Sequence, residues 1–80
     1  LQLCPELAPY PHRLAAVTSF AYNVGLGAFK ASTLRRKCRA RQWKAAAAEF
    51  HKWNKAGGRP MRGLTIRRGL ECKTFDAEGW

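Results

Sequence analysis

The acidic residues are the first candidates for chemistry in this sequence. Glycoside hydrolysis needs two carboxyl groups, or one acid and a positioned water, on either side of a sugar bond. The chain offers five carboxylates: Glu6, Glu49, Glu71, Asp76 and Glu78. Glu49 lies among lysines on a helical segment, which is typical of a surface ion-pair residue. Glu71 follows Arg67 and Arg68 at helical spacing, which predicts a local salt bridge. No two carboxylates therefore have the pattern of a catalytic pair.

Nucleophiles and bases also lack the spacing that their chemistry needs. Ser19 and Ser32 do not lie in a G-x-S-x-G turn. Neither His12 nor His51 stands at a known spacing from a serine or a cysteine. We therefore expect no nucleophilic catalysis from these residues alone.

Three cysteines, Cys4, Cys38 and Cys72, are spread along the chain. Their odd number argues against a complete disulfide framework, although one pair could form and leave one thiol free. No cysteine or histidine pair has the short spacing of a zinc site. We expect buried reduced thiols, no metal and no cofactor.

Positive charge dominates the composition, with a net charge of +10 over 80 residues. Such a field favours polyanions, including nucleic acid, anionic lipid and the acidic polymers of a bacterial envelope. The strongest cluster runs from Arg35 to Lys44. Charge alone cannot choose among these partners, and a solvated basic surface without a specific partner is the simpler alternative.

Hydrophobic periodicity predicts a small all-α domain of about four helices. Residues 1–10 are expected to form an irregular lead-in, residues 11–76 the helical domain and residues 77–80 a frayed tail. Helices are predicted at about 11–24, 33–39, 42–53 and 64–75. Gly25 would end the first helix and Ser32 would cap the second, with a tight connector between them. The expected aromatic core comprises Phe20, Phe29, Trp43, Phe50, Trp53 and Phe75.

The loop NKAGGRP after the third predicted helix is the segment whose composition best suits ligand binding. Trp53 and Asn54 stand at its start, and sugars bind to aromatic faces and to amide groups. The alternative is that Trp53 closes the core and that Gly57 and Gly58 only make the turn.

Several separate motifs resemble the phage lysozyme family. SFAYNVGLGAF fits the family pattern SF-x-x-NVG-x-GAF. It is followed by STL, by a W-K-x-A-A-x-x-F helix, by WNKAGGR and by GLTIRRGLE. These motifs occur in the family's order over about residues 14–75. The resemblance implies the C-terminal lobe of a muramidase, an enzyme that hydrolyses the β-1,4 bond between N-acetylmuramic acid and N-acetylglucosamine in peptidoglycan.

The resemblance also implies roles for single residues. Asn23 is similar to a position whose amide faces the cleft, and Trp53 and Asn54 match a stretch that packs behind the cleft and lines it. Arg67 resembles the arginine that pairs with the catalytic Glu of the other lobe, and Arg68 is the alternative for that role. No residue of this chain is expected to be catalytic.

The family's catalytic pattern, E-G-x-R-L-x-x-Y-x-D…T-x-G-x-G, does not occur in this sequence. Glu6 is followed by Leu-Ala-Pro. We therefore expect a lobe that is inactive alone, whose partners are peptidoglycan and the missing N-terminal lobe. We expect it to act on the wall or periplasm of a host bacterium, without a signal or transmembrane segment in these residues.

Two other functions stay open at this level. The first is a non-enzymatic cationic module that binds or disrupts anionic envelope or membrane surfaces. The second is nucleic-acid binding through the basic cluster. An exposed lobe interface would also favour homo-oligomers.

Overall fold

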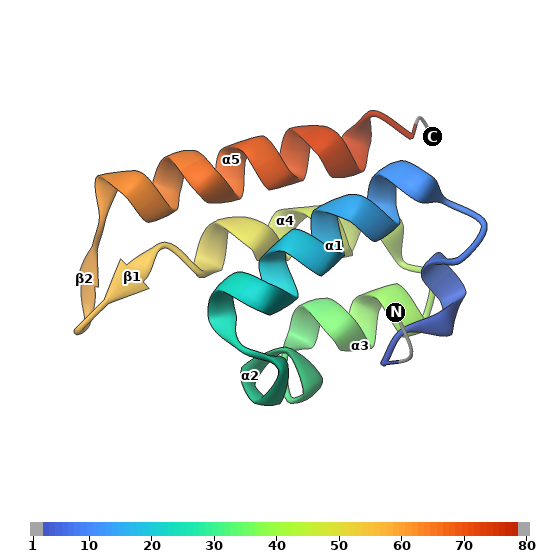
Figure 1. Ribbon diagram of the computed structural model, residues 1–80, viewed down its shortest axis with the longest axis horizontal. Helices are drawn as coiled ribbons and strands as arrows, with labels where there is room; N and C mark the ends of the chain where they lie inside the picture. The colour runs from blue at the N-terminus through green and yellow to red at the C-terminus, as the bar shows by residue number, and fades with distance from the viewer. Residues whose placement is uncertain (1–2, 79–80) are drawn as a thin grey trace.

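The computed structural model describes residues 3–78 as a small helical domain. In chain order its elements are η1 (Pro5–Leu7), α1 (Pro11–Val24), α2 (Leu26–Lys30), α3 (Thr33–Arg39), α4 (Trp43–Glu49), η2 (Phe50–Lys52), β1 (Lys55–Ala56), β2 (Arg59–Pro60) and α5 (Arg62–Asp76). Helices α1 and α5 run antiparallel and side by side, and a small hairpin projects from one end (Figure 1). The mostly helical fold class predicted from the sequence is confirmed.

Helices α1 and α3 have the predicted bounds because their ends are encoded locally. Pro11 occupies the first turn of α1, where its missing N–H costs no hydrogen bond. Gly25 ends that helix with a φ of 98°, a value that favours glycine. The Ser32 hydroxyl caps α3 by accepting a hydrogen bond from the Arg35 N–H at 3.1 Å.

The prediction of a tight connector between these helices is wrong. Helix α2 begins at Leu26, directly after Gly25, and the Phe29 N–H donates to the Gly25 carbonyl at 2.9 Å. This extra turn carries Phe29 into the core, where it is completely buried. Tertiary burial of one aromatic ring thus outweighs the weak helix propensity of a segment with glycines.

The segment predicted as the third helix is α-helical only in its first part. This part, α4, ends at Glu49, and the chain continues as the tighter helical turn η2. The NKAGGRP segment then forms a hairpin, with Lys55 paired to Pro60 and Ala56 paired to Arg59. Both central glycines have positive φ, which suits a tight two-residue hairpin turn. Two-residue strands are too short to leave an alternating pattern in the sequence.

The last helix is longer than predicted and keeps two apolar residues in solvent. α5 spans Arg62–Asp76 rather than about 64–75. Ile66 and Leu70 on this helix are exposed by 52% and 61%. No helix within residues 3–78 has the length and the apolar character needed to cross a membrane.

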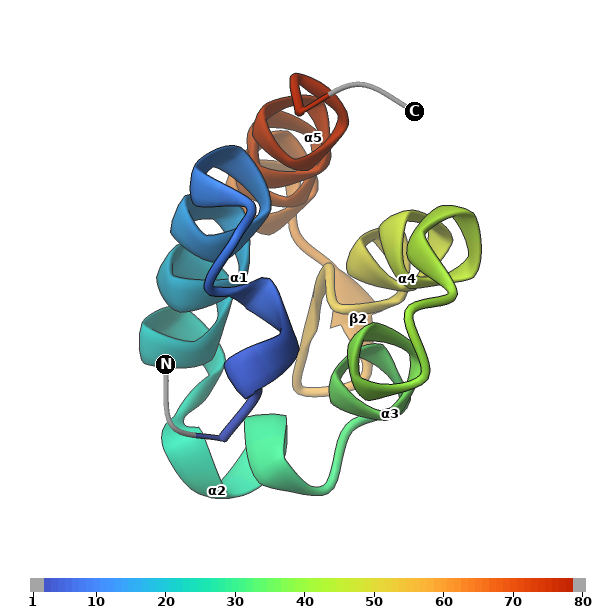
Figure 2. The same cartoon turned by 90° about the vertical axis from the view of Figure 1, so that its right-hand side faces the viewer.

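The core is built from phenylalanine rings in edge-to-face contact. Phe20, Phe29, Phe50 and Phe75 are completely buried, and the rings of Phe20 and Phe50 lie 5.5 Å apart. Trp43 and Trp53, also predicted for the core, are partly buried and pack against its edge. Figure 2 shows the helices arranged around this core, with η1 between α1 and α3.

Both ends of the described range, residues 3–78, are fastened to the domain. In the predicted lead-in, Cys4 and Leu7 are completely buried. At the other end Glu78 accepts a hydrogen bond from the His12 N–H at 2.8 Å, which satisfies a free donor at the start of α1. The predicted fraying of 77–80 falls partly on residues 79 and 80, which lie outside the described range, as do residues 1 and 2.

Replacing Leu34 with Ala is expected to lower the free energy of unfolding by about 2–5 kcal/mol, because it empties a fully buried site. The matched change Leu70→Ala removes the same atoms from an exposed site and should cost under about 0.5 kcal/mol. Urea titrations followed by circular dichroism measure both. Equal losses for the two variants would contradict this core.

Candidate functional site

A buried arginine lies where α1 packs against α5. Arg68 has no exposed surface, and its guanidinium lies 5.0 Å from the centre of the Phe20 ring. Its Nε is 2.7 Å from Glu71 Oε1, an ion pair in which the donor direction falls short of a hydrogen bond. Its Nη2 donates to Asn23 Oδ1 at 2.7 Å and to Glu71 Oε2 at 3.2 Å. Burial lowers the pKa of Arg68, and the neighbouring Glu71 carboxylate opposes that shift. Arginine stays charged at neutral pH.

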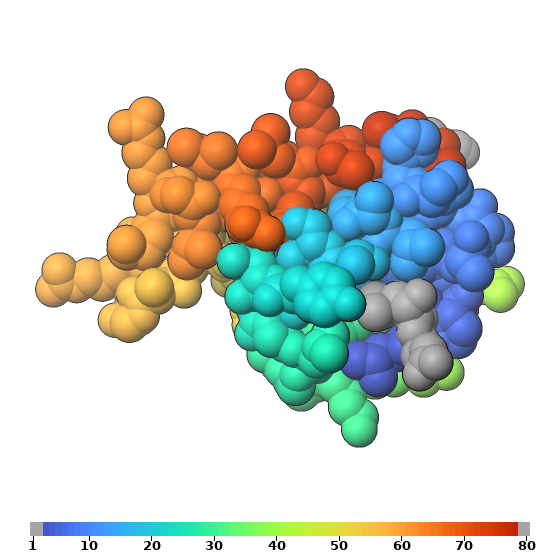
Figure 3. All heavy atoms as spheres, viewed as in Figure 1, coloured from blue at the N-terminus to red at the C-terminus, as the bar shows by residue number. Residues whose placement is uncertain are grey.

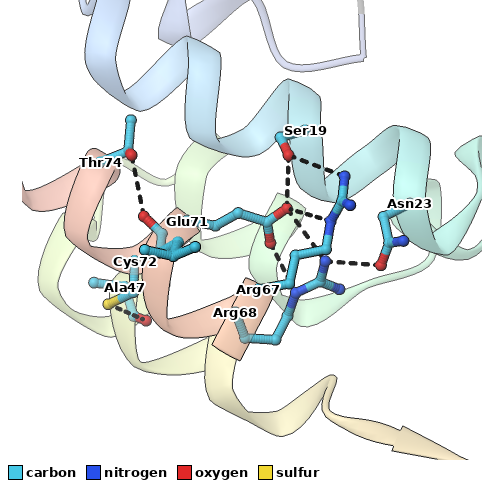
Figure 4. A network of polar contacts seen from close by, with 9 residues as sticks. Ser19, Asn23, Ala47, Arg67, Arg68, Glu71, Cys72 and Thr74 are labelled. Atoms are coloured by element: carbon cyan, nitrogen blue, oxygen red, sulfur yellow. Dashed lines mark hydrogen bonds and ion pairs between the residues drawn. The ribbon is translucent and has the colours of Figure 1, made fainter. Parts of the chain in front are cut away.

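Glu71 is the acceptor that the donors of this network share (Figure 4). Ser19 donates to Glu71 Oε2 at 2.8 Å, and Arg67 Nε contacts the same oxygen at 3.4 Å. Arg67 Nη2 also lies 3.4 Å from Ser19 Oγ. The predicted salt bridges of Glu71 with Arg67 and Arg68 are confirmed. The burial of Arg68 and Glu71 and their link to α1 were not predicted from the sequence.

One groove brings together two of the predicted site residues. It has a volume of about 270 Å³ and is lined by Asn23, Val24, Trp53, Lys55, Leu64 and Arg68. Arg68 holds Oδ1 of Asn23, so the amide NH₂ is the part left for a ligand. Trp53 meets Phe20 edge-on, with ring centres 5.4 Å apart, and also lines this groove. It therefore closes the core and borders the groove at once.

The other two predicted residues lie elsewhere. Asn54 donates through Nδ2 to Thr65 Oγ1 at 3.1 Å, and its backbone carbonyl accepts from the Met61 N–H. Asn54 therefore fastens the hairpin to α5. Arg67 has a side chain that is 47% exposed, whereas Arg68 is enclosed. A second groove of about 350 Å³ between α1 and α5 is lined by Ala15, Ala16, Ser19, Arg67, Leu70, Glu71 and Thr74.

Sequence reasoning missed that Arg68 is buried and that Ser19 is a partner of Glu71. A signal for Arg68 was present, because it shares a helical face with Leu64, Cys72 and Phe75. Ser19 gave no such signal, because its partner Glu71 is distant in the sequence.

Each carboxylate already has a partner among the described residues. Glu49 accepts from Lys52 Nζ at 2.7 Å, which confirms the predicted ion pair, although Glu49 itself is largely buried. The remaining contacts are Glu6 with Arg39 at 3.5 Å, Asp76 with the Cys72 thiol at 3.9 Å, Glu78 with His12, and Glu71 as described above. Residues 3–78 contain no cluster of three His, Cys, Asp or Glu side chains that could hold a metal ion.

A third groove is strongly basic. It has a volume of about 430 Å³ and is lined by Lys30, Ala31, Ser32, Arg35, Arg36 and Arg39. Two of its guanidiniums hold the lead-in, since Arg35 Nε donates to the Leu3 carbonyl at 2.6 Å and Arg39 pairs with Glu6. Among residues 3–78, Arg36 Nη2 contacts only its own helix, through Thr33 Oγ1 at 3.1 Å. This groove therefore presents concentrated positive charge.

Changing Glu71 to Gln is expected to destabilise the protein by about 3–5 kcal/mol, because Arg68 would keep a buried charge without a counter-charge. The matched change Glu49→Gln breaks a pair whose Lys52 is 68% exposed and should cost at most about 1 kcal/mol. Thermal and urea unfolding compare the two. Adding Arg68→Met to Glu71→Gln should recover part of the lost stability. A double variant that is less stable than the Glu71→Gln variant would contradict the buried pair.

Comparison with known proteins assigns the family. A sequence model described as phage lysozyme matches residues 3–71. An endolysin of Bacillus phage B103 is 53% identical over 60 residues, which is 75% of this chain and 23% of that protein. An endolysin of Bacillus phage PZA is 48% identical over 62 residues, 78% of this chain and 24% of that protein.

A SAR-endolysin of bacteriophage PS119 is 45% identical over 56 residues, which is 70% of this chain and 34% of that protein. The chain thus spans a quarter to a third of the length of these curated relatives. The match to the family model covers most of the chain and includes the motifs that place Asn23, Trp53 and Arg68 together. The chain belongs to the phage lysozyme family.

Proposed function

We propose that this chain is the C-terminal lobe of a peptidoglycan-hydrolysing lysozyme and forms one wall of its substrate cleft. The bond cleaved would be the β-1,4 bond between N-acetylmuramic acid and N-acetylglucosamine. Family membership supports the reaction class. The observation that carries the role of this lobe is the groove in which an amide donor, an aromatic ring and a lysine meet. These groups suit a glycan, which offers apolar ring faces together with hydroxyl and acetamido oxygens.

Within this proposal the catalytic acid comes from another part of the enzyme. A general acid must keep a proton and reach the glycosidic oxygen. Glu71 borders a groove, but Ser19, Arg67 and Arg68 all donate to its Oε2, and Arg68 Nε lies 2.7 Å from its Oε1. Both oxygens are therefore already engaged. The other four carboxylates also have partners. We infer a structural role for Glu71 and none of the five as the acid.

Arg67 is the residue that we propose to face the catalytic carboxylate. It is half exposed, and both its contacts within the network are long, at 3.4 Å. Turning its guanidinium outward would therefore break only these two long contacts, at a small cost in free energy. Arg68 is fully enclosed and already paired, so it does not fit this role.

The same surface suits an N-terminal lobe. Ile66 and Leu70 lie one helical turn apart on α5, and both are exposed. Arg67 lies between them in the sequence. Leu70 also lines the groove between α1 and α5 with Ala15 and Ala16. A covering segment would bury these apolar groups and bring a carboxylate to Arg67. We propose the second lobe, rather than a second copy of this chain, as the partner here.

The 80-residue chain alone is expected to bind soluble glycan fragments of peptidoglycan weakly and to give no clearing of a peptidoglycan suspension. Asn23→Ala should weaken binding at least about fivefold, since it removes the groove's amide donor. Asn54→Ala is the control, because Asn54 does not line the groove. NMR titration measures affinity and turbidity measures hydrolysis. Strong clearing by the chain alone would refute an external acid, and unchanged binding by Asn23→Ala would refute this groove.

A second candidate function has one observation in its favour, the basic groove along α3. We propose that it adds a non-specific attraction to anionic envelope surfaces. Charge of one sign concentrated on a helix raises the local concentration of a polyanion without any sequence-specific contact. Nucleic acid would be attracted by the same charge, so it serves as the competing outcome.

Binding to vesicles containing phosphatidylglycerol is expected to fall steeply between low and physiological salt, because the attraction is screened. Arg36→Glu should weaken it more than Lys73→Glu, which changes the net charge equally but lies on α5. Vesicle cosedimentation measures this. Equal effects of the two variants would mean that net charge alone, and not this groove, determines binding. Tighter binding to duplex DNA than to vesicles would favour nucleic acid as the partner instead.

A further inference from the structure

Two cysteines from distant parts of the chain meet inside the domain. Cys4 lies just before η1, and Cys38 lies in the last turn of α3. Both are completely buried and both are free thiols. Neither takes part in the grooves described above.

Two polar contacts fix the relative position of these cysteines. On one side of them, Arg35 Nε donates to the Leu3 carbonyl at 2.6 Å. On the other, Arg39 Nε lies 3.5 Å from Glu6 Oε1. Leu3 and Glu6 flank Cys4, whereas the two arginines flank Cys38. The lead-in is therefore held along α3 with its cysteine opposite the cysteine of the helix, and η1 lies beside α3 in Figure 2.

The Cys38 thiol is close enough to Cys4 to favour its thiolate. It therefore lowers the pKa of Cys4, and the charge of Arg39 lowers it further. The contact with Cys4 and burial raise the pKa of Cys38. The lowered pKa favours Cys4 as the attacking sulfur, because thiolate is the reactive form of cysteine.

We propose that Cys4 and Cys38 are a disulfide-forming pair that fastens the segment before α1 to α3 in the presence of a disulfide oxidant. This inference does not depend on the proposed function, because it concerns two residues that border none of the grooves.

The reaction is a double thiol–disulfide exchange with a small-molecule disulfide, RSSR. The Cys4 thiolate attacks one sulfur of RSSR, forming a mixed disulfide and releasing one RS⁻. Cys38 then loses its proton and attacks the Cys4 sulfur, which breaks the mixed disulfide and releases a second RS⁻. The two thiol protons end on the two RSH molecules. The protein loses two electrons, and RSSR gains them. Because both sulfurs are buried, the lead-in must open briefly before the first step.

Cys72 supplies the internal control. It is half-buried on α5, and its thiol contacts the Ala47 carbonyl at 3.5 Å and Asp76 at 3.9 Å. Burial raises its pKa, and the nearby Asp76 adds to that shift. It lies outside the interface of η1 and α3, so it is expected to stay a thiol.

A disulfide between residues 4 and 38 would restrict the unfolded chain far more than the folded one. It would form in an oxidising compartment and be absent under cytosolic reducing conditions. The expected consequence is a domain that becomes more stable after it leaves the cytoplasm.

The test is equilibration of the reduced chain in a buffer of oxidised and reduced glutathione, both from the folded state and by refolding from urea. We expect the three free thiols to fall to one, with Cys4 linked to Cys38 in a peptide map. The melting temperature should rise by about 5 °C or more, and dithiothreitol should reverse the rise.

The variants separate this pair from other thiol chemistry. Cys72→Ser should still form the bond and show the same rise. Cys38→Ser should stop at the first step, with glutathione attached to Cys4. Three free thiols after refolding, a link that includes Cys72, or an oxidised chain that melts no higher than the reduced one would each overturn the proposal.

Discussion

The buried ion pair between Arg68 and Glu71 is the interaction on which the rest of this domain depends. A guanidinium without solvent contact is tolerated only when a carboxylate and further acceptors surround it. Glu71 supplies the charge, and Asn23 supplies an acceptor from the neighbouring helix. The pair therefore fixes how α5 lies along α1. The groove that contains Asn23 and the groove that contains Ser19 lie beside this pair, and their shape depends on that contact.

The same contact links stability to the proposed binding surface. Asn23 has its amide oxygen held from inside, which leaves the NH₂ group to face the groove. Arg67, one residue before the buried arginine, projects to the surface because successive helical positions point in different directions. One pair of adjacent arginines thus provides an internal anchor and an external charge. Figure 3 shows that the side chains at the hairpin end project from the body of the domain, next to the start of α5.

The basic face along α3 has a different origin. Its guanidiniums are divided between structural contacts with the lead-in and free surface charge. Because Arg35 and Arg39 hold residues 3 and 6, part of the large positive charge serves the fold. Net charge alone therefore overstates how much of this surface is available to a polyanion. The same two contacts align Cys4 with Cys38, so the lead-in is an integral part of the domain.

The sequence by itself determined the local features of this protein. Pro11, Gly25 and Ser32 set helix ends through their own backbone chemistry, and the phenylalanines predicted for the core lie there. Its ordered motifs also pointed to the family, and Asn23 and Trp53 do share a groove. Only the tertiary structure decided that Phe29 draws α2 into a helix, that Arg68 is the enclosed arginine, and that Ser19 and Glu71 meet. The helical periodicity of α5 carried a signal for Arg68, but which arginine is enclosed depends on the packing of α5 against α1. Contacts such as that between Ser19 and Glu71 join residues far apart in the chain, and they leave no periodic or local signal in one sequence.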